Sequence, residues 1–178
     1  MSIWHNVKKE RITSDKFLAV IEITKGGKKK YELDKETGML ILDRILYTST
    51  HYPANYGFIP RTFAEDGDPL DVLVLCTEGL EGLTSVECYP IGAVRMTDGT
   101  DNDDKIIAIP LKDPTYNFYK DIADLPPHIL DEVMHFFTVY KQLENKNTSN
   151  LKVMSKAESK TVIRESIARY EQHFGRFM

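Results

Sequence analysis

Residues 66–77 read DGDPLDVLVLCT, an acidic turn that runs directly into an apolar segment. Asp66, Asp68 and Asp71 place three carboxylates within six positions of this stretch. Gly, Asp and Pro are typical of turns, and the apolar residues that follow are typical of a buried strand. The stretch therefore predicts a turn that feeds a strand, with acidic side chains held at the start of a rigid element.

Two interpretations of this acidic turn are open. Aspartates in turns commonly bond to their own backbone, so the segment can be a solvated turn with no further role. Alternatively, carboxylates this close together repel one another and are stabilised by a hard divalent cation such as Mg²⁺, which prefers oxygen ligands. A calcium-binding EF-hand loop is excluded, because Asp71 stands where glycine is needed and Thr77 where glutamate is needed.

Further short apolar segments, rich in β-branched residues, lie on both sides of this turn. Glycines and aspartates separate them, and this pattern predicts strands at residues 17–23, 29–33, 39–46, 72–77, 85–94 and 105–111. Because no helix is predicted between these strands, they favour an antiparallel sheet or a barrel. Residues 51–60 (HYPANYGFIP) are dense in Tyr, Pro and Gly and predict a structured loop.

The last third of the chain is predicted to be helical. Apolar residues recur at helical spacing from Ile129 to Leu143, after a Pro126-Pro127 pair that favours a helix start. A second helix is predicted to begin at Ser155, which forms a capping-box pattern with Glu158. A loop is predicted at residues 113–124 and an exposed link at residues 144–150.

The composition indicates one globular domain, residues 1–178. The hydrophobic fraction of 42% and the charged fraction of 28% are ordinary for a globular protein. A formal net charge of −4 argues against a general nucleic-acid binder. Cys76 and Cys88 lie in apolar surroundings without CxxC spacing, so they predict reduced core thiols. With no signal-peptide pattern and no apolar stretch long enough to span a membrane, we expect a cytoplasmic protein without a membrane partner.

Charged side chains interrupt three of the predicted strands. They are Glu22 in the first strand, Lys30 and Glu32 in the second and Arg44 in the third. Each alone is typical of a salt bridge or an edge position. Together they indicate a polar cavity inside or at the mouth of a barrel. The tyrosines of residues 51–60 would offer uncharged hydroxyl donors to anionic oxygens there.

A second acidic segment, residues 98–105 (DGTDNDDK), lies between two predicted strands. A charged hairpin tip accounts for this pattern. EF-hand spacing fails here too, because counting from Asp101 places Lys105 and Ile106 at positions 5 and 6.

Taken together, these segments resemble the family I soluble inorganic pyrophosphatases of the bacterial type, from residue 17 to the last helix. The family signature D-x-D-P-x-D is matched by residues 66–71, and Y-P-x-N-Y-G-[FY]-I-P by residues 52–60. Shorter matches in the same order are I-E-I at 21–23, K-Y-E at 30–32, D-R at 43–44, M-T-D at 96–98, D-x-K at 103–105, H-F-F at 135–137 and Y-K at 140–141. Two positions depart from the family: the only tryptophan is Trp4, and Val139 replaces a histidine found in some bacterial relatives.

The resemblance implies a mostly β fold with α-helices (α+β), in which a distorted five-stranded OB-like β-barrel is flanked by two C-terminal helices. It implies hydrolysis of pyrophosphate to two phosphates by a metal-activated water, with several Mg²⁺ ions in each active site. It also implies a homo-oligomer in the cytoplasm, a hexamer of two trimers, with His135 near a subunit contact.

The resemblance further implies a role for individual residues. Asp68 would be the general base. The metal ligands would be Asp66, Asp71, Asp98 and Asp103. Phosphate oxygens would be held by Lys30, Arg44, Tyr56, Lys105, Tyr140 and Lys141. Glu22, Glu32 and Tyr52 would support these groups from behind.

Two other functions remain open on the residues alone. OB-type barrels often bind oligonucleotides, although the net charge and the two acidic segments argue against a basic groove. The second alternative is another metal-dependent phosphohydrolase, acting on organic esters or nucleotides. Comparing pyrophosphate with ATP and p-nitrophenyl phosphate as substrates would separate these functions.

Overall fold

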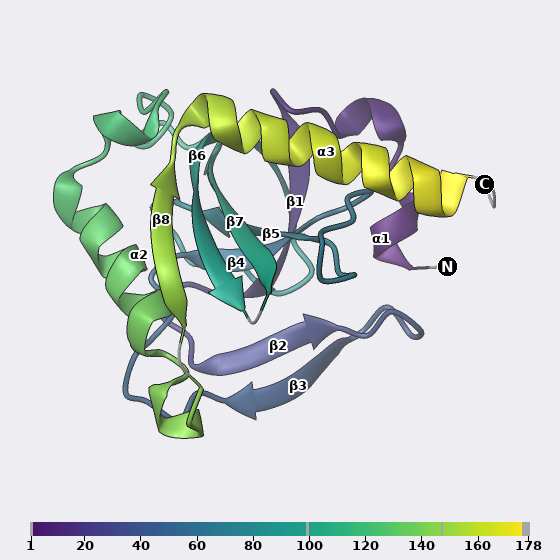
Figure 1. Ribbon diagram of the computed structural model, residues 1–178. Helices are drawn as coiled ribbons and strands as arrows, with labels where there is room; N and C mark the ends of the chain where they lie inside the picture. Colours follow the sequence, from purple (N-terminus) through teal and green to yellow (C-terminus); the bar gives the residue numbers. More distant parts are fainter. Residues whose placement is uncertain (1, 99, 147, 176–178) are drawn as a thin grey trace.

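The computed structural model describes residues 2–98, 100–146 and 148–175, without the side chain of Asp98 (Figure 1). Its strands are β1 (Phe17–Ile23), β2 (Lys29–Leu33), β3 (Leu40–Ile45), β4 (Asn55–Ile59), β5 (Leu70–Val74), β6 (Ser85–Asp98), β7 (Asp101–Pro110) and β8 (Ser149–Met154). Its α-helices are α1 (Ile3–Asn6), α2 (Pro127–Val139) and α3 (Lys156–Phe174). Short 3₁₀ turns lie at Lys9–Arg11, Ile122–Asp124 and Gln142–Glu144.

The main sheet contains a closed ring of five strands. Its strand order is β1-β4-β5-β7-β6-β8, and a further pairing of β1 with β6 closes the ring. The five-stranded closed arrangement is therefore confirmed. The expectation of an antiparallel sheet is wrong at one place, because β5 and β7 are parallel. A closed ring with an odd number of strands cannot alternate direction throughout, so at least one neighbouring pair has to be parallel.

Two strands were missed by the sequence prediction. The predicted loop at residues 51–60 contains β4, whose five residues are all buried between β1 and β5. Its Gly57 is required by packing, because a Cβ atom there would lie 1.9 Å from the carbonyl oxygen of Val20. The second missed strand, β8, overlaps the predicted exposed link and pairs with the outer side of β6. Most of its residues are exposed, so it carries no apolar pattern.

The two long helices cover different faces of the sheet (Figure 1). Helix α3 packs Val162 and Ile163 into one core cluster with β1, β5 and β7. Helix α2 packs Val133, Phe136 and Phe137 into a second cluster. No helix in the described part of the chain is long and apolar enough to span a bilayer.

The helix starts predicted from the sequence are confirmed. Helix α2 begins at Pro127, in the first-turn position that tolerates proline. At α3 the backbone N–H of Glu158 donates to Ser155 Oγ at 3.2 Å. In return, the backbone N–H of Ser155 donates to the Glu158 carboxylate at 2.7 Å. This reciprocal pair is the capping box.

Strands β2 and β3 form a separate two-stranded hairpin. In Figure 1 it lies below the main sheet, on the side where β6 ends and β7 begins. One tie to the ring is the backbone N–H of Leu33, which donates to Glu22 Oε1 on β1 at 2.8 Å. The hairpin therefore stands opposite the end of the ring that carries the acidic segments.

Candidate active site

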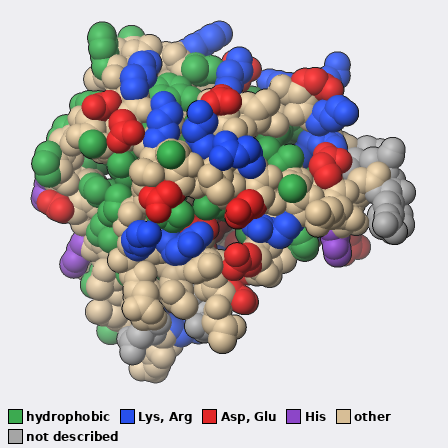
Figure 2. Space-filling view, turned by 45° about the horizontal axis from the view of Figure 1, so that its top comes forward, with side chains coloured by type: hydrophobic (Ala, Val, Ile, Leu, Met, Phe, Trp, Pro, Cys, Tyr) green, Lys and Arg blue, Asp and Glu red, His purple; other side chains and the backbone are tan. Residues whose placement is uncertain are grey.

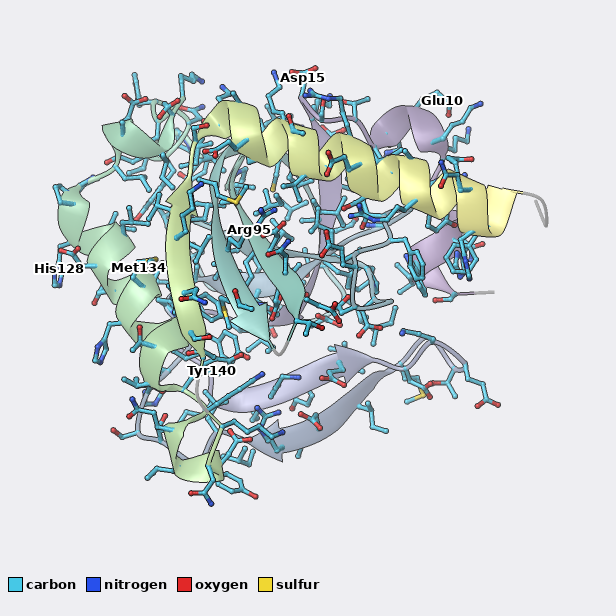
Figure 3. All side chains as sticks on the ribbon, in the orientation of Figure 1. Glu10, Asp15, Arg95, His128, Met134 and Tyr140 are labelled. Atoms are coloured by element: carbon cyan, nitrogen blue, oxygen red, sulfur yellow. The ribbon has the colours of Figure 1, made fainter. Side chains whose placement is uncertain are left out.

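A cavity of about 440 Å³ lies between the β2–β3 hairpin and the strands of the ring. Its charged lining consists of six carboxylates and four lysines: Glu22, Glu32, Asp66, Asp68, Asp71, Asp103, Lys30, Lys35, Lys105 and Lys141. Tyr140, labelled in Figure 3, follows the end of α2 and completes the wall beside the hairpin. Figure 2 shows acidic and basic side chains interspersed on one face of the molecule.

Strand register brings four of the predicted site residues together. Asp71 on β5 lies directly opposite Lys105 on the parallel strand β7, and opposite Phe58 on β4. Side chains alternate along a strand, so Tyr56 shares the face of Phe58 and Asp103 shares the face of Lys105. We call Tyr56, Asp71, Asp103 and Lys105 the inner group.

The ammonium of Lys105 holds the inner group together. It donates to Asp71 Oδ2 at 2.8 Å, to Asp103 Oδ1 at 2.9 Å and to the Tyr56 hydroxyl at 3.0 Å. The Tyr56 hydroxyl in turn donates to Asp71 Oδ2 at 2.5 Å. Burial alone would lower the pKa of Lys105, whose side chain is 3% exposed, but Asp71 and its other partners hold that pKa well above its ordinary value. Lys105 is therefore a permanent cation.

The carboxylates of the cavity are only partly neutralised. Burial raises the pKa of Asp71, and repulsion from Asp103 adds to this effect while Lys105 opposes it. Burial also raises the pKa of Glu22 to about 8, with a further contribution from the Asp71 charge. Both shifts mean that further negative charge is unfavourable here, so the site would be stabilised by an added cation.

The acidic turn lies at the open side of the cavity. Gly67 takes a positive φ of 86°, which favours glycine, and the backbone N–H of Asp68 donates to Asp66 Oδ1 at 3.0 Å. The interpretation of this segment as a turn in which an aspartate bonds to the backbone is thus correct for Asp66 and Asp68. The Asp68 carboxylate also pairs with the ammonium of Lys35, and both side chains are about half exposed.

The hairpin contributes a second set of ion pairs. Lys30 pairs with Glu32 on the same strand and with Asp43 on β3 at 3.4 Å. Arg44 pairs with Asp43 and, through Nε, with Glu144 Oε1 at 2.8 Å. Lys30 and Glu32 line the cavity, whereas Arg44 faces the segment that follows α2.

Most of the residues predicted for the site converge on the cavity. Those that line it are Glu22, Lys30, Glu32, Tyr56, Asp66, Asp68, Asp71, Asp103, Lys105, Tyr140 and Lys141. Arg44 and Tyr52 do not line it. Tyr52 is 2% exposed and packs its ring 5.2 Å from that of Tyr56 and 4.7 Å from that of Phe136, behind the inner group.

Asp98, predicted as a metal ligand, has a side chain that lies outside the described residues; its backbone pairs with Asp101 at the end of β6. Among the side chains that are described, no three Asp, Glu, His or Cys are arranged as ligands around one point. The Lys105 ammonium lies between Asp71 and Asp103 and is bonded to one oxygen of each carboxylate.

Sequence reasoning missed Lys35, which lines the cavity from the turn between β2 and β3. The signals that identified other site residues were clustered acids, charges on strand faces and family motifs. Lys35 belongs to none of them, since it lies in a polar turn two residues after the end of β2.

The profile of the inorganic pyrophosphatase family matches residues 19–171 of this chain. The chain is 44% identical over 171 residues to soluble inorganic pyrophosphatase 2 of Chlamydomonas reinhardtii, covering 96% of this chain and 89% of that protein. It is 50% identical over 146 residues to the soluble inorganic pyrophosphatase PPA1 of Solanum tuberosum, covering 82% and 69% of the two chains.

Solved structures agree with this assignment. The inorganic pyrophosphatase of Helicobacter pylori aligns with a TM-score of 0.84 at 42% identity, over 89% of this chain and 95% of that one. The inorganic pyrophosphatase of Thermus thermophilus aligns with a TM-score of 0.85 at 38% identity, over 88% and 92%. The α+β architecture predicted from the sequence is therefore confirmed, and the chain belongs to the inorganic pyrophosphatase family.

Proposed function

We propose that this chain hydrolyses inorganic pyrophosphate to two phosphates, in a single domain spanning residues 1–178, with Mg²⁺ as the cofactor. Membership of the family makes it an inorganic diphosphatase. The observation that carries the proposal is the inner group: a buried lysine and tyrosine bound to two carboxylates, open to a cavity with six carboxylates and four lysines. Such a site offers cations to the phosphoryl oxygens and oxygen ligands to metal ions.

The donor set fits Mg²⁺. The charged acceptors in the described cavity lining are all carboxylate oxygens, which Mg²⁺ prefers. The raised pKa of Asp71 also favours an added cation. Asp66, Asp71 and Asp103 would hold the ions, together with Asp98 by resemblance. Bound Mg²⁺ would acidify water and shield the phosphoryl charge.

The substrate would be held by residues of the strands, the hairpin and the end of α2. Lys30, Lys105, Lys141, Tyr56 and Tyr140 all face the cavity and would bind phosphate oxygens. Arg44 would join them by exchanging its partner Glu144 for phosphate. Because pyrophosphate is highly anionic, this binding would neutralise the charge that otherwise repels an attacking water.

Asp68 would orient that water and accept its proton. Its carboxylate stands at the open side of the cavity and is not bonded to Lys105. The remaining predicted residues would act through others. Glu22 anchors the hairpin through Leu33, Glu32 contacts Lys30, and Tyr52 packs against Tyr56.

The proposal is tested by comparing pyrophosphate, ATP and p-nitrophenyl phosphate with Mg²⁺ and after its removal with EDTA. We expect pyrophosphate to be hydrolysed at least about a hundredfold faster than either alternative, and only with metal. Asp101→Asn removes an exposed acid that does not line the cavity, so this variant should keep full activity and is the control for variants of the cavity acids. Comparable rates on all three substrates would favour a general phosphohydrolase. Tight binding of single-stranded DNA on a filter would favour the oligonucleotide-binding alternative.

We also propose that the chain forms a homohexamer. Support comes from two exposed surfaces. Helix α2 turns Asp131, Glu132 and His135 to solvent, on the side opposite its buried stripe. The hairpin and the residues around it expose large apolar side chains: Met39, Ile41, Leu42, Ile45 and Tyr47. Sedimentation is expected to give a species several times the 20.4 kDa chain mass, and a stable monomer at micromolar concentration would contradict the proposal.

For the location of the protein we propose the cytoplasm. Cys76 and Cys88 are both free and buried, as is usual for proteins of a reducing compartment. Cell fractionation should recover the protein with cytoplasmic markers. Recovery with secreted or membrane fractions would contradict this location.

A further inference from the structure

Lys35 joins three distant parts of the chain at the mouth of the cavity. It lies in the turn between β2 and β3, and its ammonium pairs with the carboxylate of Asp68 in the acidic turn. The same ammonium lies 5.3 Å from the centre of the Trp4 ring, which belongs to α1. This distance is within the range of a cation–π contact.

Trp4 is a fixed platform for this contact. Its side chain is 4% exposed, and its Nε1–H donates to the carbonyl oxygen of Thr62 at 2.9 Å. Its ring also packs 5.1 Å from that of Phe174 and 6.2 Å from that of Phe63. An indole held in this way cannot follow Lys35 if the lysine moves. Because Trp4 is the only tryptophan in the chain, its fluorescence would register such a movement.

Two other lysines of the cavity, Lys30 and Lys105, are held more firmly than Lys35. Lys105 is 3% exposed and bonded to two carboxylates and a tyrosine. Lys30 is 18% exposed and pairs with two carboxylates. Lys35 is 49% exposed, and its carboxylate partner, Asp68, is 57% exposed. Exposed ion pairs of this kind contribute little to stability, so Lys35 can change partners at small cost.

We propose that Lys35 is a substrate-binding residue that exchanges the Asp68 carboxylate for a phosphate oxygen when pyrophosphate or phosphate enters the cavity. The inference rests on the proposed function and adds one ligand to it. A phosphate group carries more charge than one carboxylate and attracts the ammonium more strongly. The exchange leaves Asp68 free to accept a proton only after substrate is in place. It also draws the ammonium away from Trp4.

The first test follows Trp4 emission while inorganic phosphate is added to the protein in saturating Mg²⁺. We expect a saturable change in the wild-type protein and in Lys35→Arg, and none in Lys35→Met. Lys29→Met is the matched control, because Lys29 is an exposed lysine of the same hairpin that lies 6.0 Å from the ring centre of Tyr31, away from Trp4. Its emission response should equal that of the wild type.

The second test compares the kinetics of pyrophosphate hydrolysis. Lys35→Met should raise KM about tenfold and change kcat less than about threefold, the pattern of a lost binding contact. Lys35→Arg should restore most of the KM, and Lys29→Met should leave both constants unchanged. The inference is overturned if Lys35→Met keeps the wild-type KM or the wild-type emission response. A wild-type protein that does not hydrolyse pyrophosphate would refute the proposed function instead, and its emission response to phosphate would still test Lys35.

Discussion

The inner group and the rim of the cavity use the same kinds of side chains in different ways. We define the rim as Lys30, Glu32, Lys35 and Asp68, from the hairpin and the acidic turn. The inner group projects from neighbouring strands and surrounds an ammonium that is 3% exposed. The rim consists of ion pairs in which at least one partner is about half exposed. Its charges can therefore respond to a ligand, whereas those of the inner group are fixed by the fold.

The difference is energetic as well as geometric. Removing one member of a buried pair leaves the other charged and without hydration, which commonly costs about 3–5 kcal/mol. An exposed pair commonly contributes about 0–1 kcal/mol. Substitutions in the inner group should therefore affect folding, and substitutions in the rim should affect binding or chemistry alone.

The largest expected effect is that of Asp68→Asn at the rim. Asparagine has nearly the same shape but cannot accept a proton, so kcat should fall about 10²- to 10⁴-fold, the usual range for loss of a general base. The free energy of unfolding should change by less than about 0.5 kcal/mol, because Asp68 is exposed. Stopped assays with pyrophosphate and urea denaturation measure the two quantities. A large loss of stability would remove the distinction between rim and inner group.

Lys105→Met should have the next largest effect, this time on folding. The substitution leaves Asp71 and Asp103 without their shared cation, so we expect the free energy of unfolding in EDTA to fall by about 3–5 kcal/mol. Lys35→Met, the matched rim variant, should lower it by less than about 1 kcal/mol. Urea denaturation of both variants gives the comparison. Equal losses would show that burial does not separate the two regions.

The effect that is smallest over any single pH unit is a change in pH dependence at Glu22. Its pKa rises from 4.5 when unfolded to about 8 when folded, so the folded state holds the extra proton between these values. Wild-type stability should therefore fall as pH rises from about 5 to 8. Glu22→Gln keeps the acceptor for the Leu33 N–H and removes the titration. In EDTA, as pH rises from about 5 to 8, the free energy of unfolding of the variant should increase relative to that of the wild type by at most about 1.4 kcal/mol per pH unit. Parallel stability profiles would contradict the raised pKa.

Features set by neighbouring residues were predictable from the sequence. The capping box needs only Ser155 and Glu158, and both bonds are present. The strands at residues 17–23 and 29–33 were predicted at their observed bounds because apolar or alternating segments end at clear turn residues. The acidic turn was predicted as a turn, and Gly67 confirms it.

Features set by distant residues were not predictable in this way. Strand β4 reads as a loop because Tyr, Pro and Gly are dense there, yet Gly57 is needed for close contact with Val20. The inner group depends on the parallel pairing of β5 with β7, which no local pattern indicates. Its residues were identified through family motifs. Lys35 had neither signal, since its partners Trp4 and Asp68 lie far from it in sequence.

The central claim is that the carboxylates of the inner group bind Mg²⁺, whereas Asp68 at the rim orients the attacking water and accepts its proton. Calorimetric titration of Mg²⁺ tests this claim most directly. Asp68→Asn should bind Mg²⁺ as the wild type does, and its lowered turnover should not recover at any Mg²⁺ concentration. Asp71→Asn should bind Mg²⁺ at least about tenfold more weakly, and excess Mg²⁺ should restore part of its turnover. Weakened Mg²⁺ binding by Asp68→Asn with rescue at high Mg²⁺, and neither effect in Asp71→Asn, would contradict the claim.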